Sequence, residues 1–196
     1  MQKGGIGGNE SEGFMTKANF NVDTAHSGIY FTVSHLVVAK IRGAFRKWSA
    51  ELTIDETDVT KSSVVVEIDA ASVDTGNAQR DADLRSVKFF DTENYPVLAF
   101  RSRRVDRMGE NACRVTGDLT IRGVTRSAVL VVIPGGFVTD PWGGRRAGFT
   151  ATTSLERSAF GMVWNQALDG GGVFVGDGVD IAIEIEAVSQ TATSAA

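Results

Sequence analysis

Strict alternation of apolar and polar side chains is the feature that most limits the folds open to this chain. In its last long stretch, Val179, Ile181, Ile183 and Ile185 alternate with charged or small residues. A period of two places the apolar side chains on one face of a β-strand and the polar ones on the other. The pattern recurs along the chain from residue 29 onwards, so the sequence predicts about eight half-buried strands.

These strands predict an all-β protein. Helices that could cover a parallel sheet are missing from the pattern, so we expect an antiparallel sheet. The apolar faces of such a sheet meet either in a sandwich or in a closed barrel. We favour a barrel of about eight strands, because its interior is wide enough for packed side chains or for one small ligand.

The stretch from residue 77 to residue 102 breaks the alternation. Its first part is rich in Ala, Gln, Arg, Asp and Leu, which favours a short helix near residues 77–90. Asn77 is the expected N-cap, and Asp81 is placed to pair with Arg85 one turn later. The pair Phe89-Phe90 follows. We expect the helix to flank or close one end of the barrel and to lay these aromatic rings over an apolar surface.

The segment from residue 128 to residue 146 departs from alternation in another way. Residues 128–133 are apolar on both faces, which predicts a strand that is covered on both sides. The sequence Pro134-Gly135-Gly136 predicts the end of that strand. Arg145 and Arg146 are expected to be solvated residues at a strand end.

Composition limits the location and the partners of the chain. A formal net charge of −4 argues against a nucleic-acid surface, which needs clustered cations. No run is long enough to cross a bilayer as a helix, so no transmembrane segment is expected. The first 14 residues, MQKGGIGGNESEGF, lack the apolar core of a secretory signal. We therefore expect a cytoplasmic protein, or a periplasmic one if a leader has been removed.

The length of 196 residues indicates one domain. We place this domain at residues 18–190. Residues 1–17 are Gly-rich and polar, which predicts a disordered arm, and residues 191–196 are expected to form a frayed tail.

The sequence has no constellation typical of catalysis. His26 and His35 are nine residues apart, and odd spacing on a strand places side chains on opposite faces, so a shared metal is not expected. The single cysteine, Cys113, excludes an internal disulfide and is expected to be a buried thiol. Neither a Gly-x-Ser-x-Gly nucleophile motif nor a phosphate-binding loop occurs. We expect no enzymatic activity, no metal and no covalent cofactor.

Polar residues on the apolar face of three strands leave two interpretations open. His35, Ser102 and Thr153 each continue an otherwise apolar row. Buried polar groups need hydrogen-bond partners, which can be neighbouring protein groups or trapped water. Alternatively, these side chains hold the polar end of a ligand whose body fills the barrel, since ligand cavities are mostly apolar with a few placed polar groups.

Residues 19–190 resemble the YceI-like family, the polyisoprenoid-binding, lipocalin-like proteins of bacteria. The resemblance rests on the order and spacing of short motifs along nearly the whole stretch. They are Asp23 with His26-Ser27, Phe31 with His35, Gly43 with Phe45, Arg80-Asp81 with Leu84-Arg85-Ser86, Phe89-Phe90-Asp91, Pro96, Phe100 with Ser102, Gly117-Asp118-Leu119-Thr120, Gly123-Val124-Thr125, Asp140-Pro141-Trp142-Gly143-Gly144, Arg146-Ala147-Gly148-Phe149, Arg157 with Phe160-Gly161, and Val175-Gly176-Asp177.

The resemblance implies an extended eight-stranded antiparallel barrel with a long apolar tunnel. It also implies a ligand such as an isoprenoid quinone, a polyprenyl phosphate, or a fatty acid or amide. Many members are periplasmic and dimeric, so the resemblance favours a homodimer. The sequence departs from the family at two places: Asp83 stands where a histidine is usual, and the usual signal peptide is missing.

The combined hypothesis is a protein that binds, stores or transports a long-chain amphiphile, most simply an isoprenoid. The residues predicted to contact it share the apolar parity of their strands and are Phe31, Val33, His35, Phe45, Val66, Leu98, Phe100, Ser102, Leu119, Phe149, Thr153 and Ile183. His35, together with Ser102 or Thr153, is predicted to contact the head group. One alternative is a structural or stress-response barrel that is filled by its own side chains and binds a protein partner. A hydrolase or isomerase with His35 as its base ranks last.

Overall fold

The computed structural model describes residues 17–36, 38–167 and 172–190. The predicted arm and tail fall almost wholly outside these ranges. The elements follow one another as β1 (Lys17–Val22), β2 (Gly28–His35), β3 (Ala39–Phe45), β4 (Trp48–Asp55), η1 (Val59–Lys61), β5 (Ser63–Asp69), η2 (Ala70–Ser72), β6 (Val73–Asp74), α1 (Ala78–Arg85), β7 (Val97–Met108), β8 (Ala112–Ile121), β9 (Val124–Thr139), β10 (Arg145–Glu156), η3 (Arg157–Phe160) and β11 (Val175–Ser189). Among these residues no helix is long and apolar enough to span a membrane.

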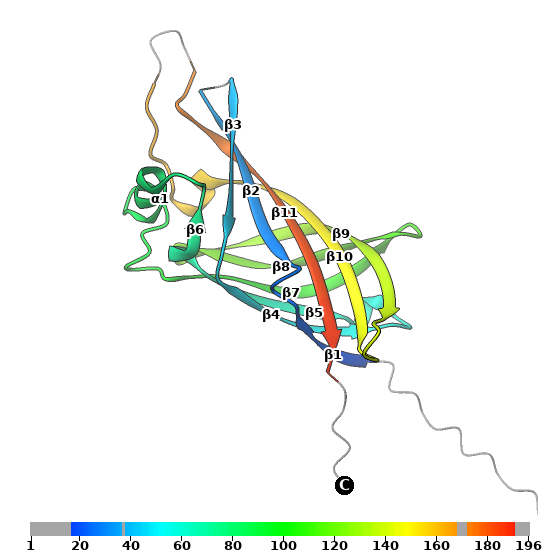
Figure 1. The fold of residues 1–196 in the computed structure, drawn as a ribbon. Coiled ribbons are helices and arrows are strands. Elements are labelled where there is room, and N and C mark those ends of the chain that lie inside the picture. The colour runs from blue at the N-terminus through cyan, green and yellow to red at the C-terminus, as the bar shows by residue number, and fades with distance from the viewer. Residues whose placement is uncertain (1–16, 37, 168–171, 191–196) are drawn as a thin grey trace, which may run out of the picture.

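The strands form one antiparallel barrel, as predicted (Figure 1). The hydrogen-bonded order runs β1-β4-β5-β7-β8-β9-β10-β11, and the pairing of β1 with β11 closes the ring of eight strands. At two of the eight positions in the ring, one strand ends and a second strand continues its line. β2 continues β1 along β11, and β3 continues β4 along β2. These continuations project past the barrel at the end that carries α1.

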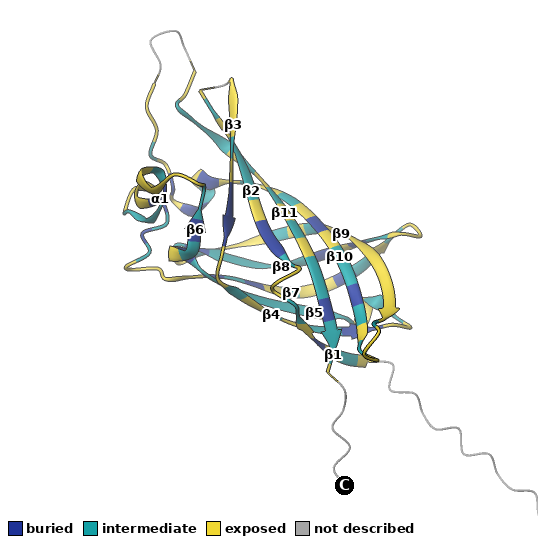
Figure 2. Ribbon diagram, in the orientation of Figure 1, coloured by how far each residue is buried: buried dark blue, intermediate teal, exposed yellow. Residues whose placement is uncertain are grey.

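Alternation determines which side chains enter the barrel. Along β10 and β11, Phe149 lies opposite Ile185 and Ala151 lies opposite Ile183, while the intervening Thr150 and Thr152 are exposed. Buried and exposed positions therefore alternate along the strands of the barrel (Figure 2). The buried residues gather in three clusters, one at the α1 end and two toward the opposite end of the barrel.

The predicted helix is α1, and it lies at one end of the barrel (Figure 1). Asn77 caps it by accepting a hydrogen bond from the backbone N–H of Arg80. The predicted pairing of Asp81 with Arg85 is wrong. Asp81 is buried and accepts from the N–H and hydroxyl of Thr75. Arg85 instead donates to the carbonyls of residues 71 and 73, so both side chains fix the helix to the preceding segment.

Strand β9 differs from the prediction in two respects. Its outer face is not covered, since Val129, Val131 and Ile133 are 43%, 37% and 52% exposed. The strand also continues through Pro134-Gly135-Gly136 rather than ending there. Gly135 is accommodated by a register shift, because Gly136 and Pro134 pair with the consecutive residues Gly148 and Phe149. A bulge of this kind absorbs one extra residue and lets a proline remain in a strand.

Arg146 is not a freely solvated strand end, contrary to the prediction. Its guanidinium donates to Asp140 at 2.8 Å, to Asp23 at 3.1 Å and to Glu186 at 2.5 Å. A hydrogen bond from Arg146 holds the pKa of Asp140 below its usual range, and hydrogen bonds with His26 and then with Arg146 do the same for the pKa of Asp23. The network joins the β9–β10 turn to β11 and to the end of β1, and so stabilises the end of the barrel opposite α1. Arg145 pairs with Glu56 across the same end.

Candidate functional site

The barrel encloses an apolar cavity of about 220 Å³. Protein interiors are close-packed, and a single water molecule needs only about 10–15 Å³ measured in the same way. The cavity is therefore far larger than a packing defect. Inward-facing side chains of β2 to β5 and β7 to β11 line it.

Most of the predicted contact residues meet in this cavity. Those that line it are Phe31, Phe45, Val66, Leu98, Phe100, Leu119, Phe149, Thr153 and Ile183. They come from seven strands that are far apart in the sequence, and the closure of the barrel brings them together. Gly43 contributes by having no side chain, because a Cβ there would lie 2.3 Å from Cζ of Phe31.

Val33, His35 and Ser102 do not line the cavity. Val33 and His35 lie in the part of β2 that projects past the barrel. The ring of His35 packs against that of Phe174, with 4.6 Å between the ring centroids. The Nδ1 atom of His35 is buried and has no hydrogen-bond partner among the described residues. Ser102 lies at a register shift in β7, and its hydroxyl accepts from the N–H of Val64 at 2.9 Å. A head-group contact by His35 or Ser102 stays a prediction that this geometry does not support.

Several lining residues were missed by the sequence prediction. They are Ile29, Trp48, Leu52, Ile54, Val59, Val64, Ile68, Val105, Cys113, Val115, Ile121, Leu130, Val132, Ile181 and Ile185, together with smaller contacts. Most have the same parity as a predicted neighbour, so the pattern contained the signal. Trp48 and Val59 each follow an interruption between two elements. The alternation starts again there, so parity does not predict on which face these side chains lie.

Among the described residues, those that line the cavity carry no charge. The polar residues in this lining are Tyr30, Ser62, Ser63, Thr153, Cys113 with its thiol and Trp48 with its indole N–H. Burial raises the pKa of Cys113, which keeps the thiol protonated and unreactive near neutral pH. None of these groups forms a nucleophile and base pair. The cavity is suited to holding an apolar chain.

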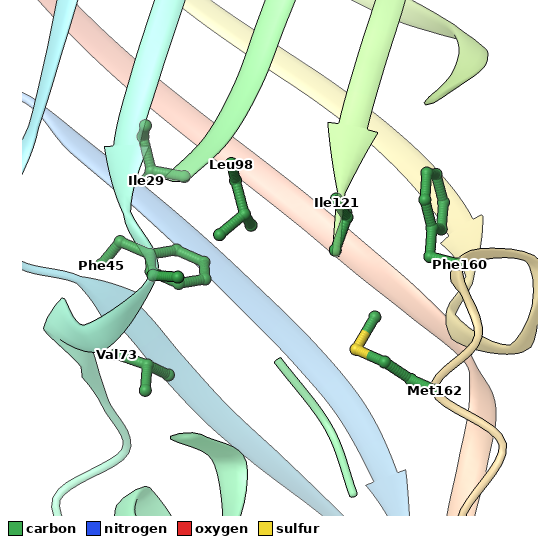
Figure 3. Packing of buried hydrophobic residues seen from close by; sticks show 8 residues of the cluster. Ile29, Phe45, Val73, Leu98, Ile121, Phe160 and Met162 are labelled. Atoms are coloured by element: carbon green, nitrogen blue, oxygen red, sulfur yellow. The ribbon is translucent and has the colours of Figure 1, made fainter. Parts of the chain in front are cut away.

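Aromatic and aliphatic side chains close the α1 end of the cavity. Phe90, just after α1, packs edge-on against Phe45 with 5.6 Å between ring centroids. The neighbouring Phe89 packs against Trp164 at the same distance. Figure 3 shows the buried cluster here, in which Ile29, Phe45, Leu98, Ile121, Phe160 and Met162 converge from separate strands and loops. The predicted role of the Phe89-Phe90 pair, covering an apolar surface, is confirmed.

One cluster of metal-ligand type occurs within the described ranges. Ligand atoms of Asp23, His26 and Glu186 lie within 4.8 Å of one another. The guanidinium of Arg146 donates to both carboxylates and supplies the positive charge that a cation would otherwise provide. The cluster is explained by the ion pairs that stabilise this end of the barrel.

Comparison with known proteins gives a consistent result. The family described as "YceI-like domain" matches residues 20–187. A UPF0312 protein of Vibrio cholerae is 41% identical over 147 residues, which are 74% of this chain and 78% of the relative. A UPF0312 protein of Pseudomonas savastanoi is 37% identical over 154 residues, covering 78% of this chain and 80% of the relative.

Solved structures share the fold. BcnA of Burkholderia cenocepacia superimposes with a TM-score of 0.75 at 27% identity, covering 84% of this chain and 98% of that chain. The YCEI protein of Campylobacter jejuni superimposes with a TM-score of 0.70 at 28% identity, covering 80% of this chain and 90% of that chain. A polyisoprenoid binding domain from Saccharophagus degradans gives 0.63 at 17% identity, with 87% and 98% covered, which shows a common fold.

Proposed function

The chain belongs to the YceI-like family, and from this premise we propose that it binds a long-chain amphiphile, most simply an isoprenoid, inside its barrel. The single observation that carries the proposal is the uncharged apolar cavity of about 220 Å³. A hydrocarbon chain is the ligand chemistry that fits such a lining, because apolar surface gains free energy when it leaves water.

The proposal has a sufficient energetic basis. Each buried methylene contributes about 0.8 kcal/mol, less the cost of immobilising the ligand. A chain of a few isoprene units therefore binds tightly without a charged anchor in the cavity. The name of the Saccharophagus domain, which has the same fold, adds support for an isoprenoid as the chain. An isoprenoid quinone and a polyprenyl phosphate both satisfy this requirement.

The competing functions have less support. A barrel filled by its own side chains would not leave a void of this size. A hydrolase or isomerase acting on a bound lipid needs a base beside the chain, and His35 is not part of the cavity lining. We therefore propose a role in binding, storage or transport, without catalysis. The homodimer implied by the family resemblance stays a prediction.

A chain-length series tests the proposal. We expect the affinity for geraniol, farnesol and geranylgeraniol to rise at least tenfold with each added isoprene unit until the cavity is full, because each unit buries more apolar surface. Displacement of a fluorescent lipid probe measures the three dissociation constants. A short linear alcohol of equal polarity is the control. Weak affinity that does not change with chain length would contradict the proposal and favour the filled barrel.

A further inference from the structure

The wall of the barrel is interrupted at one place. The ladder between β1 and β4 ends at the pair Asn21–Glu51, and the ladder between β2 and β3 begins at the pair Ile29–Phe45. Between these pairs, residues 22–28 and residues 46–50 do not pair with each other. We call this interruption the seam. It lies where the chain bends from β1 into β2 and from β3 into β4 (Figure 1).

The two edges of the seam form hydrogen bonds with residues outside it. On one edge, the N–H of Arg46 donates to the carbonyl of Ser72, and the carbonyl of Lys47 accepts from Asp69. On the other edge, the hydroxyl of Ser27 both donates to and accepts from the backbone of residue 186. These hydrogen bonds hold both edges against residues outside the seam.

A pocket of about 340 Å³ occupies the seam. Ile29, Tyr30, Phe45 and Trp48 line both this pocket and the apolar cavity. The two spaces are thus separated by the thickness of single side chains. Ile29 and Phe45 also belong to the buried cluster at the α1 end, so the seam lies beside that cluster and next to the cavity.

The polar groups of the seam pocket are cations and hydroxyls. Its lining includes Arg46, Lys47, Thr24 and Ser27, and no carboxylate. The Nε of Arg46 pairs with Asp74 at 2.8 Å, and its terminal nitrogens have no hydrogen-bond partner among the described residues.

The ammonium group of Lys47 pairs with Asp69 at 3.1 Å, and its side chain is 80% exposed. Exposed ion pairs of this kind are weak, and an ammonium group has three donors. Both cations at the seam therefore retain donors for an additional anion.

We propose that the seam is a portal that holds an anionic head group, a phosphate or a carboxylate, of the amphiphile whose chain fills the cavity. The inference rests on the proposed function and adds the class and position of the head group. Arg46 and Lys47 bind the anion, while the hydroxyls of Thr24 and Tyr30 are placed to donate to it. The apolar side chains of Ile29, Phe45 and Trp48 line the path by which the ligand's hydrocarbon chain enters the cavity.

Matched ligands and charge variants test this proposal. The ligands are geranylgeranyl phosphate, stearate, and the two uncharged alcohols with the same chains. The double variant Arg46→Gln/Lys47→Gln removes the cations of the seam. The control Arg103→Gln/Arg104→Gln removes two exposed cations that are likewise paired with carboxylates, but on the outer part of β7.

We expect wild-type protein to bind at least one anion more tightly than its alcohol. The seam variant should lose about three- to tenfold in affinity for that anion, as two exposed charge contacts provide. Its affinity for the alcohols, and all affinities of the control variant, should stay within about twofold of wild type. A larger loss for the phosphate or for the stearate identifies the head group.

Each other outcome has a definite meaning. If the seam variant binds the anions as tightly as wild type does, the portal is wrong while the proposed function stands. If wild type binds neither the anions nor the alcohols, the proposed function itself fails.

The orientation of the chain gives a second, independent readout. In the variant Trp142→Phe/Trp164→Phe, Trp48 is the only remaining tryptophan of the three. A stearate with a nitroxide beside its carboxylate should quench Trp48 fluorescence more strongly than a stearate with the nitroxide at its methyl end. Stronger quenching by the methyl-end label would overturn the portal.

Discussion

Replacing Ala151 by Trp should abolish tight binding of the long-chain ligand while leaving the barrel folded. Ala151 is buried at the middle of β10, lies between Val132 and Ile183, and lines the cavity. An indole there occupies the space that a chain needs. Excluding about 100 Å² of chain from burial costs about 2.5 kcal/mol, which is roughly 50- to 100-fold in affinity. Displacement of a fluorescent lipid probe measures the loss.

The adjacent residue provides a matched control. Thr152 is exposed on the outer face of the same strand, so Thr152→Trp adds the same side chain outside the barrel. It should bind lipid as wild type does. Both variants should keep a cooperative melting transition, since filling a cavity is often neutral or stabilising. Unchanged lipid affinity in a folded Ala151→Trp protein would show that the chain does not occupy this cavity.

Replacing Arg157 by Met should strongly lower the free energy of unfolding, and more than the cavity and seam substitutions do. Arg157 is only 5% exposed, and its guanidinium donates to the carbonyls of Gly176 at 2.9 Å and Trp164 at 2.9 Å, and also to that of Met162. Burial lowers the pKa of this guanidinium, which still remains charged near neutral pH. The variant leaves these carbonyls without their donors. Such groups cost about 1–3 kcal/mol each, so we expect a loss of about 3 kcal/mol or more.

Thermal unfolding measures this effect. For a chain of this size the loss corresponds to a decrease in Tm of about 10 °C. Arg114→Met is the control, because Arg114 is exposed on the outer face of β8. It should melt within about 2 °C of wild type, as surface substitutions usually do. If the two variants melt alike, Arg157 does not hold the loop after β10 to the start of β11 as described.

The barrel and most of its lining could be predicted from the sequence because they depend on a local pattern. Side chains two residues apart on a strand share a face, so Phe149 and Ile183 were correctly placed inside from parity alone. The N-cap at Asn77 was predicted for the same reason, since a cap depends only on the next few residues.

The errors arise where parity is interrupted or where a partner is distant in the sequence. The register shift after Ser102 moves the cavity-lining positions of β7 from even to odd numbers, so Val105 lines the cavity although the parity of Phe100 does not predict it. His35 follows the correct alternation, but its part of β2 has left the barrel, which depends on how far the neighbouring strands extend. The three partners of Arg146 come from separate segments that only the folded barrel brings together.

The seam could not be predicted for a related reason. It needs two breaks, one between β1 and β2 and one between β3 and β4, to lie opposite each other. The sequence from Gly43 to Ile54 keeps strand character across the second break. Register between distant strands decides whether two such breaks meet, and it cannot be read from either segment alone.

Native mass spectrometry of the protein purified from its own host tests the central claim most directly. The intact mass reports whether a ligand is bound, and solvent extraction followed by mass analysis identifies it. We predict one long-chain amphiphile per barrel, released when the protein unfolds and absent from the Ala151→Trp variant prepared in the same way. A mass equal to that of the polypeptide alone, unchanged after incubation with isoprenoid quinones, prenyl phosphates and fatty acids, would contradict the account.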